Sequence, residues 1–172
     1  MVTVPLAFDP ALFRKTMGGF ASGVTVITVD DGGTPHGMTA NAFMSGSLMP
    51  PLCVVSIAKR AHTHGMIEAA GRFGVNILGE DQRDVALYFS GRKSLEVDAH
   101  FETIEETPLL RGSAARIVAR VESRSECGDH TLFIGAIRFM EANDSPPLLY
   151  HRGAFGGLAA RKLGHVPVPE FW

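Results

Sequence analysis

Cysteines and long apolar runs are scarce in this sequence. Cys53 and Cys127 are the two cysteines among 172 residues. Two widely spaced cysteines form neither a disulfide framework nor a zinc-binding pattern, and they favour a reducing compartment. No stretch approaches the roughly 20 apolar residues of a membrane helix. The first residues also lack the basic and apolar regions of a signal peptide, so we expect a cytoplasmic protein.

A strong excess of charge is also lacking. The chain has 16 basic and 18 acidic side chains, for a formal net charge of −2. Because no basic excess is present, neither a nucleic acid nor an anionic membrane is an expected partner. The length fits one domain over residues 1–172, with a core over about residues 13–158 and a C-terminal tail at 159–172.

Several common nucleotide-binding and catalytic motifs are absent. The stretch Gly18–Gly23 has the glycine spacing of a phosphate loop but lacks the following Lys-Ser/Thr pair. No G-x-G-x-x-G follows a strand, and no G-x-S-x-G is present, which disfavours a Rossmann domain and an α/β-hydrolase. His62 and His64 have no third ligand candidate nearby in sequence, so we predict no metal site.

Short strands dominate the predicted secondary structure. Dense β-branched or alternating segments predict strands at 24–29, 36–41, 52–57, 73–78, 115–124 and 131–140. They are not regularly interleaved with crossover helices, which disfavours a parallel sheet. The polar stretch Gly91–Gly112 predicts a long loop. The pattern as a whole favours a mainly β protein, a mostly antiparallel barrel surrounded by a few short helices.

Three helices are expected around these strands. Asp9 followed by Pro10 is typical of a helix start, and Gly23 is expected to end that helix. A short helix is predicted at 64–70. A further helix is predicted from an Asp81 cap to Ser90.

Three segments carry polar groups that suit a phosphorylated heterocycle. Small and amide-bearing residues in Gly37–Phe43 can offer hydrogen bonds to a planar ring, or simply form a polar turn. Lys59 and Arg60 lie near a predicted helix start, where two cations can form either a phosphate site or a solvated basic turn. Asn76 interrupts an apolar strand, so its amide must satisfy either a ligand or a neighbouring loop.

A fourth segment, Gly128-Asp129-His130, combines a tight-turn pair with a histidine at a strand entrance. An imidazole in that place can donate a hydrogen bond or a proton, or stack on another ring. A surface histidine explains the same pattern equally well.

Together these segments resemble the short-chain flavin reductase family, the reductase components of two-component flavin monooxygenases. The resemblance extends from about Phe13 to Leu158. The matching pieces are Phe20–Thr28, His36–Phe43, Ser47–Leu52, Phe73–Leu78, Gly128–Gly135 and Leu148–Tyr150.

The resemblance implies an FMN-binding split β-barrel, a homodimer, and NAD(P)H:flavin oxidoreductase activity with FMN or FAD. It implies that reduced flavin passes to a partner monooxygenase. His130 would contact the nicotinamide and is the expected catalytic residue. The expected flavin-binding residues are Thr39, Asn41, Ala42, Ser56, Lys59, Arg60, Thr63, Asn76, Arg92 and Tyr150.

Two other functions are compatible with such a barrel. A non-catalytic protein could hold FMN or haem without using nicotinamide, and it would not need the Gly128-Asp129-His130 turn. An oxidase of a phosphorylated vitamin would need more substrate-binding cations than Lys59, Arg60, Arg92 and Lys93 provide.

Overall fold

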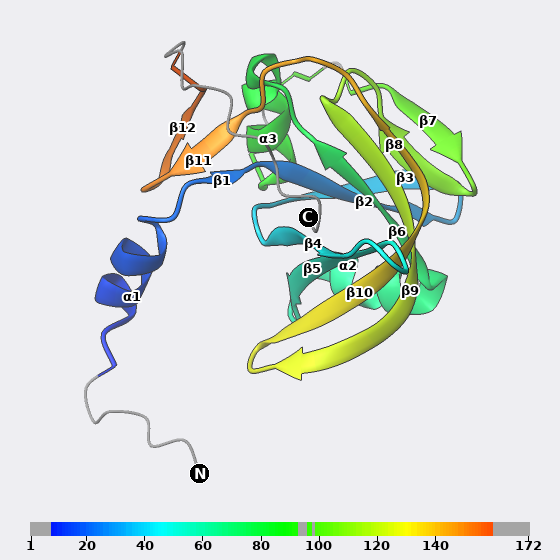
Figure 1. Ribbon diagram of the computed structural model, residues 1–172, viewed down its shortest axis with the longest axis horizontal. Coiled ribbons are helices and arrows are strands. Elements are labelled where there is room, and N and C mark those ends of the chain that lie inside the picture. Colours follow the sequence, from blue (N-terminus) through cyan, green and yellow to red (C-terminus); the bar gives the residue numbers. More distant parts are fainter. Residues whose placement is uncertain (1–7, 93–95, 98, 160–172) are drawn as a thin grey trace.

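The fold is mainly β, with antiparallel strand pairing throughout (Figure 1). The structure is a computed structural model that describes residues 8–92, 96–97 and 99–159, so most of the expected tail lies outside the described residues. The strands are β1 (Ser22–Gly23), β2 (Thr25–Asp31), β3 (Thr34–Ala40), β4 (Phe43–Ser47), β5 (Leu52–Ala58), β6 (Arg72–Ile77), β7 (Phe101–Ile104), β8 (Thr107–Leu110), β9 (Ala115–Cys127), β10 (His130–Ala142), β11 (Leu149–His151) and β12 (Ala154–Gly156).

The helices are short and lie outside the sheets. They are α1 (Pro10–Met17), α2 (His62–Ala70) and α3 (Arg83–Phe89), with a 3-10 turn η1 (Glu80–Gln82) before α3. At the start of α1, Asp9 accepts a 2.8 Å hydrogen bond from the Ala11 N–H, which confirms the predicted cap. No helix of the described segments is long and apolar enough to cross a membrane.

A seven-stranded sheet, ordered β3-β2-β6-β9-β10-β5-β4, carries the main core. Strands from across this order bury side chains in one cluster, including Ile27 of β2, Ile57 of β5 and Phe133 of β10. Met38 of β3 and Phe43 of β4, from the two edge strands, pack against the same cluster. The sheet therefore curves strongly around its core, as the predicted barrel architecture requires.

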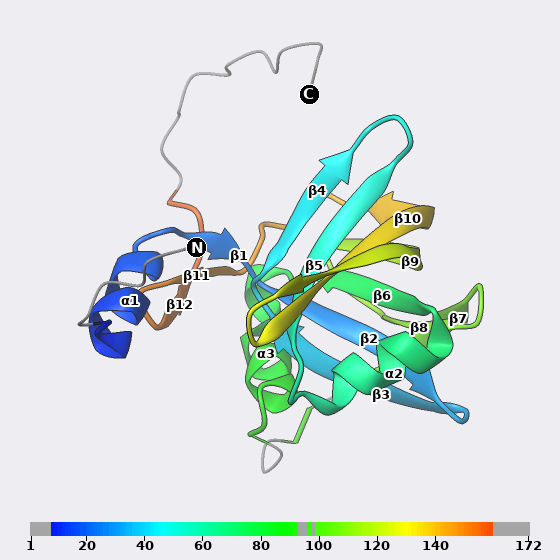
Figure 2. The same cartoon turned by 90° about the horizontal axis from the view of Figure 1, so that it is seen from below.

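Two long hairpins extend beyond this core (Figures 1 and 2). One joins β9 to β10 through a turn at Gly128, whose φ of 60° is the left-handed conformation that glycine adopts readily. The other joins β4 to β5. A three-stranded sheet, β1-β11-β12, lies apart from them and carries α1 on its outer side (Figures 1 and 2).

Three expectations for local structure were wrong. Helix α1 ends at Met17 because the Gly18-Gly19 pair caps it early, and Gly23 pairs with Leu149 in β1. Asp81 does not cap a helix. It lies within η1, where the Gln82 side chain accepts the Gly79 N–H at 3.0 Å.

The predicted loop at 91–112 contains the β7–β8 hairpin, the third expectation that was wrong. Strand β8 is buried along its whole length. Its burial comes from packing against β6 and β2, which local sequence cannot reveal.

Gly135 is required where β10 crosses the core. A Cβ atom added there would lie 2.7 Å from the Ala119 Cβ and 2.8 Å from the Phe73 Cζ, both in fully buried residues. We expect Gly135→Ala to lower the free energy of unfolding by about 2 kcal/mol through overpacking. Urea denaturation measures this, with Gly156→Ala as control because nothing lies within 4 Å of a Cβ there. Equal stability of the two variants would contradict the packing argument.

Candidate functional site

A cleft of about 350 Å³ opens between the end of β3, helix α3 and the β11–β12 hairpin. We name it the Thr39–Tyr150 cleft. It is lined by Val24, Thr39, Ala40, Asn41, Leu87, Ser90, Arg92, Tyr150, Gly153 and Phe155. Four of the residues predicted to bind flavin, from three separate parts of the chain, are thus brought together: Thr39, Asn41, Arg92 and Tyr150.

Close packing fixes two walls of this cleft. A Cβ at Gly37 would lie 2.8 Å from the Phe89 ring, so only glycine lets α3 approach β3 this closely. The Thr39 hydroxyl then donates a 2.7 Å hydrogen bond to the Ala86 carbonyl of α3. On the opposite side the Tyr150 and Phe155 rings meet edge to face, with their centroids 5.5 Å apart.

The chemistry of the cleft suits a planar ring with mixed hydrogen-bonding groups. The Thr39 oxygen keeps lone pairs that can accept from a ligand N–H, and the exposed Asn41 amide can both donate and accept. Arg92 adds a cation, while Leu87 and Phe155 supply apolar contact area. Apolar walls with a few convergent polar groups are typical of a heterocycle-binding site.

A second group of predicted residues lies where β5 ends beside the β9–β10 turn. The Ala42 carbonyl accepts a 3.0 Å hydrogen bond from the Ser56 N–H, which ties the segment between β3 and β4 to β5. The Lys59 N–H donates to the Asp129 carbonyl at 3.0 Å, and the Lys59 Nζ donates to the Gly128 carbonyl at 3.0 Å. Lys59 also forms an ion pair with Glu126. These contacts fix the turn against the start of α2, where Arg60 is exposed.

His130 begins β10 directly after this turn, as predicted, and is paired with Ala58 of β5. Its Nδ1 lies 2.8 Å from the Asp129 Oδ1, and 41% of its side chain is exposed. The hydrogen bond from His130, together with its charge, lowers the pKa of Asp129 below its ordinary value. A carboxylate that holds Nδ1–H leaves Nε2 as the ring nitrogen available to a ligand.

Two predicted site residues have their polar groups occupied inside the protein. The Asn76 amide donates to the Val26 carbonyl at 2.8 Å and to the Thr28 hydroxyl at 3.1 Å, and it accepts the Leu110 N–H at 2.7 Å. Thr63 is buried, with its hydroxyl 3.1 Å from the His36 Nε2. These contacts favour structural roles for Asn76 and Thr63 over direct ligand contact.

Sequence reasoning missed the walls of the cleft that α3 and the β11–β12 hairpin provide. These residues are Leu87, Ser90, Gly153 and Phe155, and Val24 and Ala40 were missed as well. Gly153 was the local sequence signal of the hairpin turn, in which Arg152 and Gly153 adopt φ values of 49° and 84°.

The two cysteines are expected to differ sharply in reactivity. Burial raises the pKa of the Cys53 thiol to about 11, so it stays protonated and shielded at pH 8. Cys127 is exposed and pairs across the turn with His130. We expect a thiol reagent such as Ellman's reagent to modify Cys127 alone in the folded protein and both cysteines in denaturant. Native-state labelling of Cys127→Ser would contradict this.

A mainly β, antiparallel fold with a cleft for a heterocycle defines a class of ligand-binding barrel, and comparison with known proteins narrows it. The model of the "Flavin reductase like domain" family matches residues 17–159. The chain belongs to this family, and its predicted fold class is confirmed.

Curated relatives support the same assignment. An "NADH-dependent flavin reductase" from Rhodococcus sp is 40% identical over 152 residues, which cover 87% of this chain and 86% of that protein. The "Flavin-dependent monooxygenase, reductase subunit HsaB" from Rhodococcus jostii is 36% identical over 167 residues, which cover 95% of this chain and 84% of that protein.

Among solved structures, "Flavin reductase PheA2 in native state" superimposes with a TM-score of 0.86 at 42% identity. The match covers 88% of this chain and 99% of that one.

Proposed function

We propose that this protein is an NAD(P)H:flavin oxidoreductase that transfers a hydride from reduced nicotinamide to FMN or FAD. The observation that carries the proposal is the Thr39–Tyr150 cleft, which gathers four expected flavin-binding residues in a protein whose relatives are named as NADH-dependent reductases. Those names favour a reductase over a protein that merely holds FMN or haem.

The flavin ring is assigned to the Thr39–Tyr150 cleft. Thr39 and Asn41 would hold the polar edge of the ring, and Tyr150 would close its side. Arg92 offers a cation to the ribityl-phosphate. When bound, the flavin supplies the hydride acceptor, and the reduced nicotinamide supplies the hydride.

A phosphate could also bind at the start of α2. Ala61, the N-cap of this helix, makes no side-chain capping bond, and Lys59 and Arg60 precede it. A helix start with two adjacent cations favours an anion. The hydrogen bond from the Ser56 N–H to the Ala42 carbonyl links β5, which leads to this helix start, to the segment that follows Asn41 of the Thr39–Tyr150 cleft.

His130 is assigned to the nicotinamide. With Nδ1–H held by ionised Asp129, the ring orientation is restricted. Nε2 can then donate to the carboxamide oxygen of a nicotinamide when the ring is protonated, or accept from its NH₂ group when the ring is neutral. The contribution of such a residue is positioning, because hydride transfer requires a close and oriented approach of the two rings.

We further propose that the reduced flavin passes to a monooxygenase. The support is the name of the relative HsaB, which describes a reductase subunit of a flavin-dependent monooxygenase. A cytoplasmic location accords with two unpaired cysteines, which persist where thiols stay reduced.

A homodimer is proposed from the outer face of the seven-stranded sheet. Met44 of β4 is paired with Val54 of β5, which is paired with Ile134 of β10, so three apolar side chains form a row across the outer face. Met44, Leu48 and Met49 are 59%, 71% and 88% exposed in the single chain. A second copy would cover this apolar surface. Sedimentation of the protein and of Val54→Lys tests the assignment: a dimer that the substitution dissociates supports it, and a monomeric wild type overturns it.

The activity is tested by following NADH and NADPH oxidation with FMN and FAD in all four combinations, alongside flavin dissociation constants. We expect at least one combination to proceed much faster than the reaction of NAD(P)H with free flavin. Flavin binding without NAD(P)H oxidation would overturn the proposal in favour of a flavin-holding protein.

A further inference from the structure

A second cleft, of about 620 Å³, adjoins the Thr39–Tyr150 cleft. It lies between α1 and the β11–β12 turn, and we name it the α1 cleft. Asn41, Tyr150 and Gly153 line both clefts, so the two form one continuous depression. A bound molecule longer than a single ring system could therefore extend from one into the other.

The lining of the α1 cleft is basic. Arg14 and Lys15 come from the last turn of α1, and Arg152 comes from the β11–β12 turn. Within the part of the chain that the structure describes, no acidic side chain lines this cleft and no ion pair neutralises the three cations. The dipole of α1 favours cations at its end, which explains Arg14 and Lys15 but not Arg152. Three uncompensated cations around one cleft favour an anionic ligand.

Apolar side chains lie among these cations. Phe13, Met17 and Phe20 line the α1 cleft and are 51%, 57% and 79% exposed. No residue of α1 is buried, and the helix stands away from the main sheet (Figure 2). Aromatic faces next to cations suit a ligand that combines a flat base with phosphates.

The backbone fixes the cationic side of the cleft. The Arg152 N–H donates a 2.9 Å hydrogen bond to the Gly18 carbonyl, which ties the turn to the end of α1. Arg152 has a φ of 49°, a left-handed conformation that is uncommon and costly for arginine. The turn therefore holds an arginine where glycine or asparagine is expected on conformational grounds.

We propose that the α1 cleft binds the adenosine diphosphate moiety of a dinucleotide. The diphosphate would lie among Arg14, Lys15 and Arg152, and the adenine against the exposed Phe13 or Phe20 ring. FAD and NADH both contain this moiety, and FMN does not. The inference rests on the proposed function, since it extends the flavin and nicotinamide sites already assigned.

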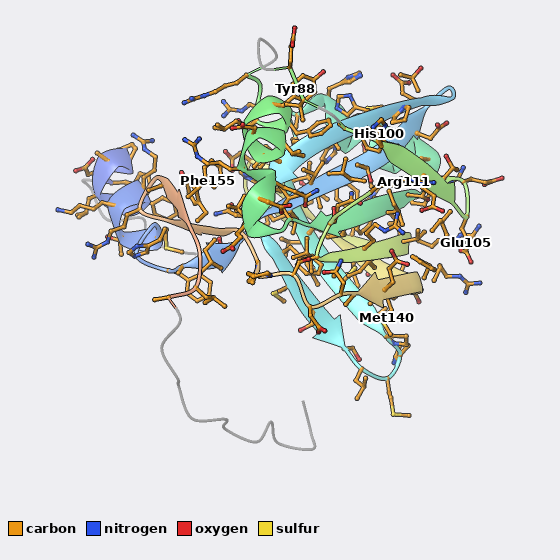
Figure 3. The ribbon with its side chains drawn as sticks, turned by 90° about the horizontal axis from the view of Figure 1, so that it is seen from above. Tyr88, His100, Glu105, Arg111, Met140 and Phe155 are labelled. Carbon is orange, nitrogen blue, oxygen red and sulfur yellow. The ribbon has the colours of Figure 1, made fainter. Side chains whose placement is uncertain are left out.

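The test compares charge-neutralised variants. Arg14→Gln/Lys15→Gln removes two cations, and Arg152→Gln removes the third at an equal backbone cost. Arg120→Gln/Arg138→Gln is the matched control. Arg138 lies beside Glu105, which is on the side of the molecule opposite α1 (Figure 3). Dissociation constants for FAD and FMN are measured by flavin fluorescence, and KM for NADH is measured with FMN as acceptor.

If FAD provides the moiety, the α1-cleft variants raise the FAD dissociation constant about tenfold and leave that of FMN within about twofold. If NADH provides the adenosine diphosphate moiety, KM for NADH rises about tenfold while the dissociation constants of FAD and FMN stay unchanged. Either result supports the proposal. The proposal is overturned if the α1-cleft variants behave as the control variant does. It is also overturned if they change only the sedimenting mass, because this result would mean that a second copy of the chain occupies the cleft. If the α1-cleft proposal is overturned but the variants still oxidise NADH with FMN, the proposed function stands.

Discussion

Replacing His130 by alanine is expected to lower kcat/KM for NADH by about 30-fold and to change flavin dissociation constants by less than about twofold. The reason is that His130 lies at the β9–β10 turn, outside the Thr39–Tyr150 cleft that is assigned to the flavin ring. Its Nδ1 is already held by Asp129, so its effect on a ligand comes through a ring of fixed orientation.

Two companion variants sharpen this prediction. Asp129→Asn keeps the imidazole but weakens the hydrogen bond that orients it, so we expect a smaller decrease in kcat/KM for NADH than in His130→Ala. His100 directly precedes β7 and lies away from α1 (Figure 3), so His100→Ala should change neither kcat/KM for NADH nor the flavin dissociation constants. If His130→Ala weakened flavin binding as much as it slowed NADH use, the histidine would belong to the flavin site instead.

Replacing Asn76 by alanine is expected to lower the free energy of unfolding by about 4 kcal/mol, because it leaves buried hydrogen-bonding groups without partners. The groups affected are the Val26 carbonyl and the Thr28 hydroxyl of β2 and the Leu110 N–H of β8. The Thr28 hydroxyl keeps its hydrogen bond to the Pro108 carbonyl. The amide thus holds β2, β6 and β8 together at the centre of the protein. Urea denaturation measures the loss.

Asn41→Ala is the matched comparison. Asn41 is exposed in the Thr39–Tyr150 cleft, so its substitution should leave stability nearly unchanged and weaken flavin binding. The two asparagines are predicted to show opposite effects. An Asn76→Ala protein of nearly normal stability that binds flavin poorly would contradict the structural role given to Asn76.

Strands with a strong local pattern were predictable from the sequence. The run Val24–Val29 is dense in β-branched residues and supplies most of β2, and Leu52–Ile57 forms most of β5. The tight turn before His130 was also predictable, because Gly-Asp favours a turn conformation regardless of the rest of the fold. Fold class then followed from the lack of regularly interleaved crossover helices.

Elements that depend on distant packing were not predictable. Strand β8 contains Pro108, which argues against a strand in isolation, yet β8 is buried against β6. That Asn76 must be satisfied was foreseeable, but its partner Leu110 lies 34 residues away along the chain. Phe155 was missed as a wall of the cleft because its hairpin is positioned through pairing between Tyr150 and Ser22.

The central claim is that this chain reduces flavin with NADH or NADPH. The most direct measurement is anaerobic rapid mixing of the enzyme, excess flavin and reduced nicotinamide, followed by the visible absorbance of the flavin. The account predicts that the absorbance of many equivalents of flavin is bleached per enzyme, at a rate that saturates with nicotinamide and falls in His130→Ala. Bleaching no faster than in the absence of the protein would contradict it.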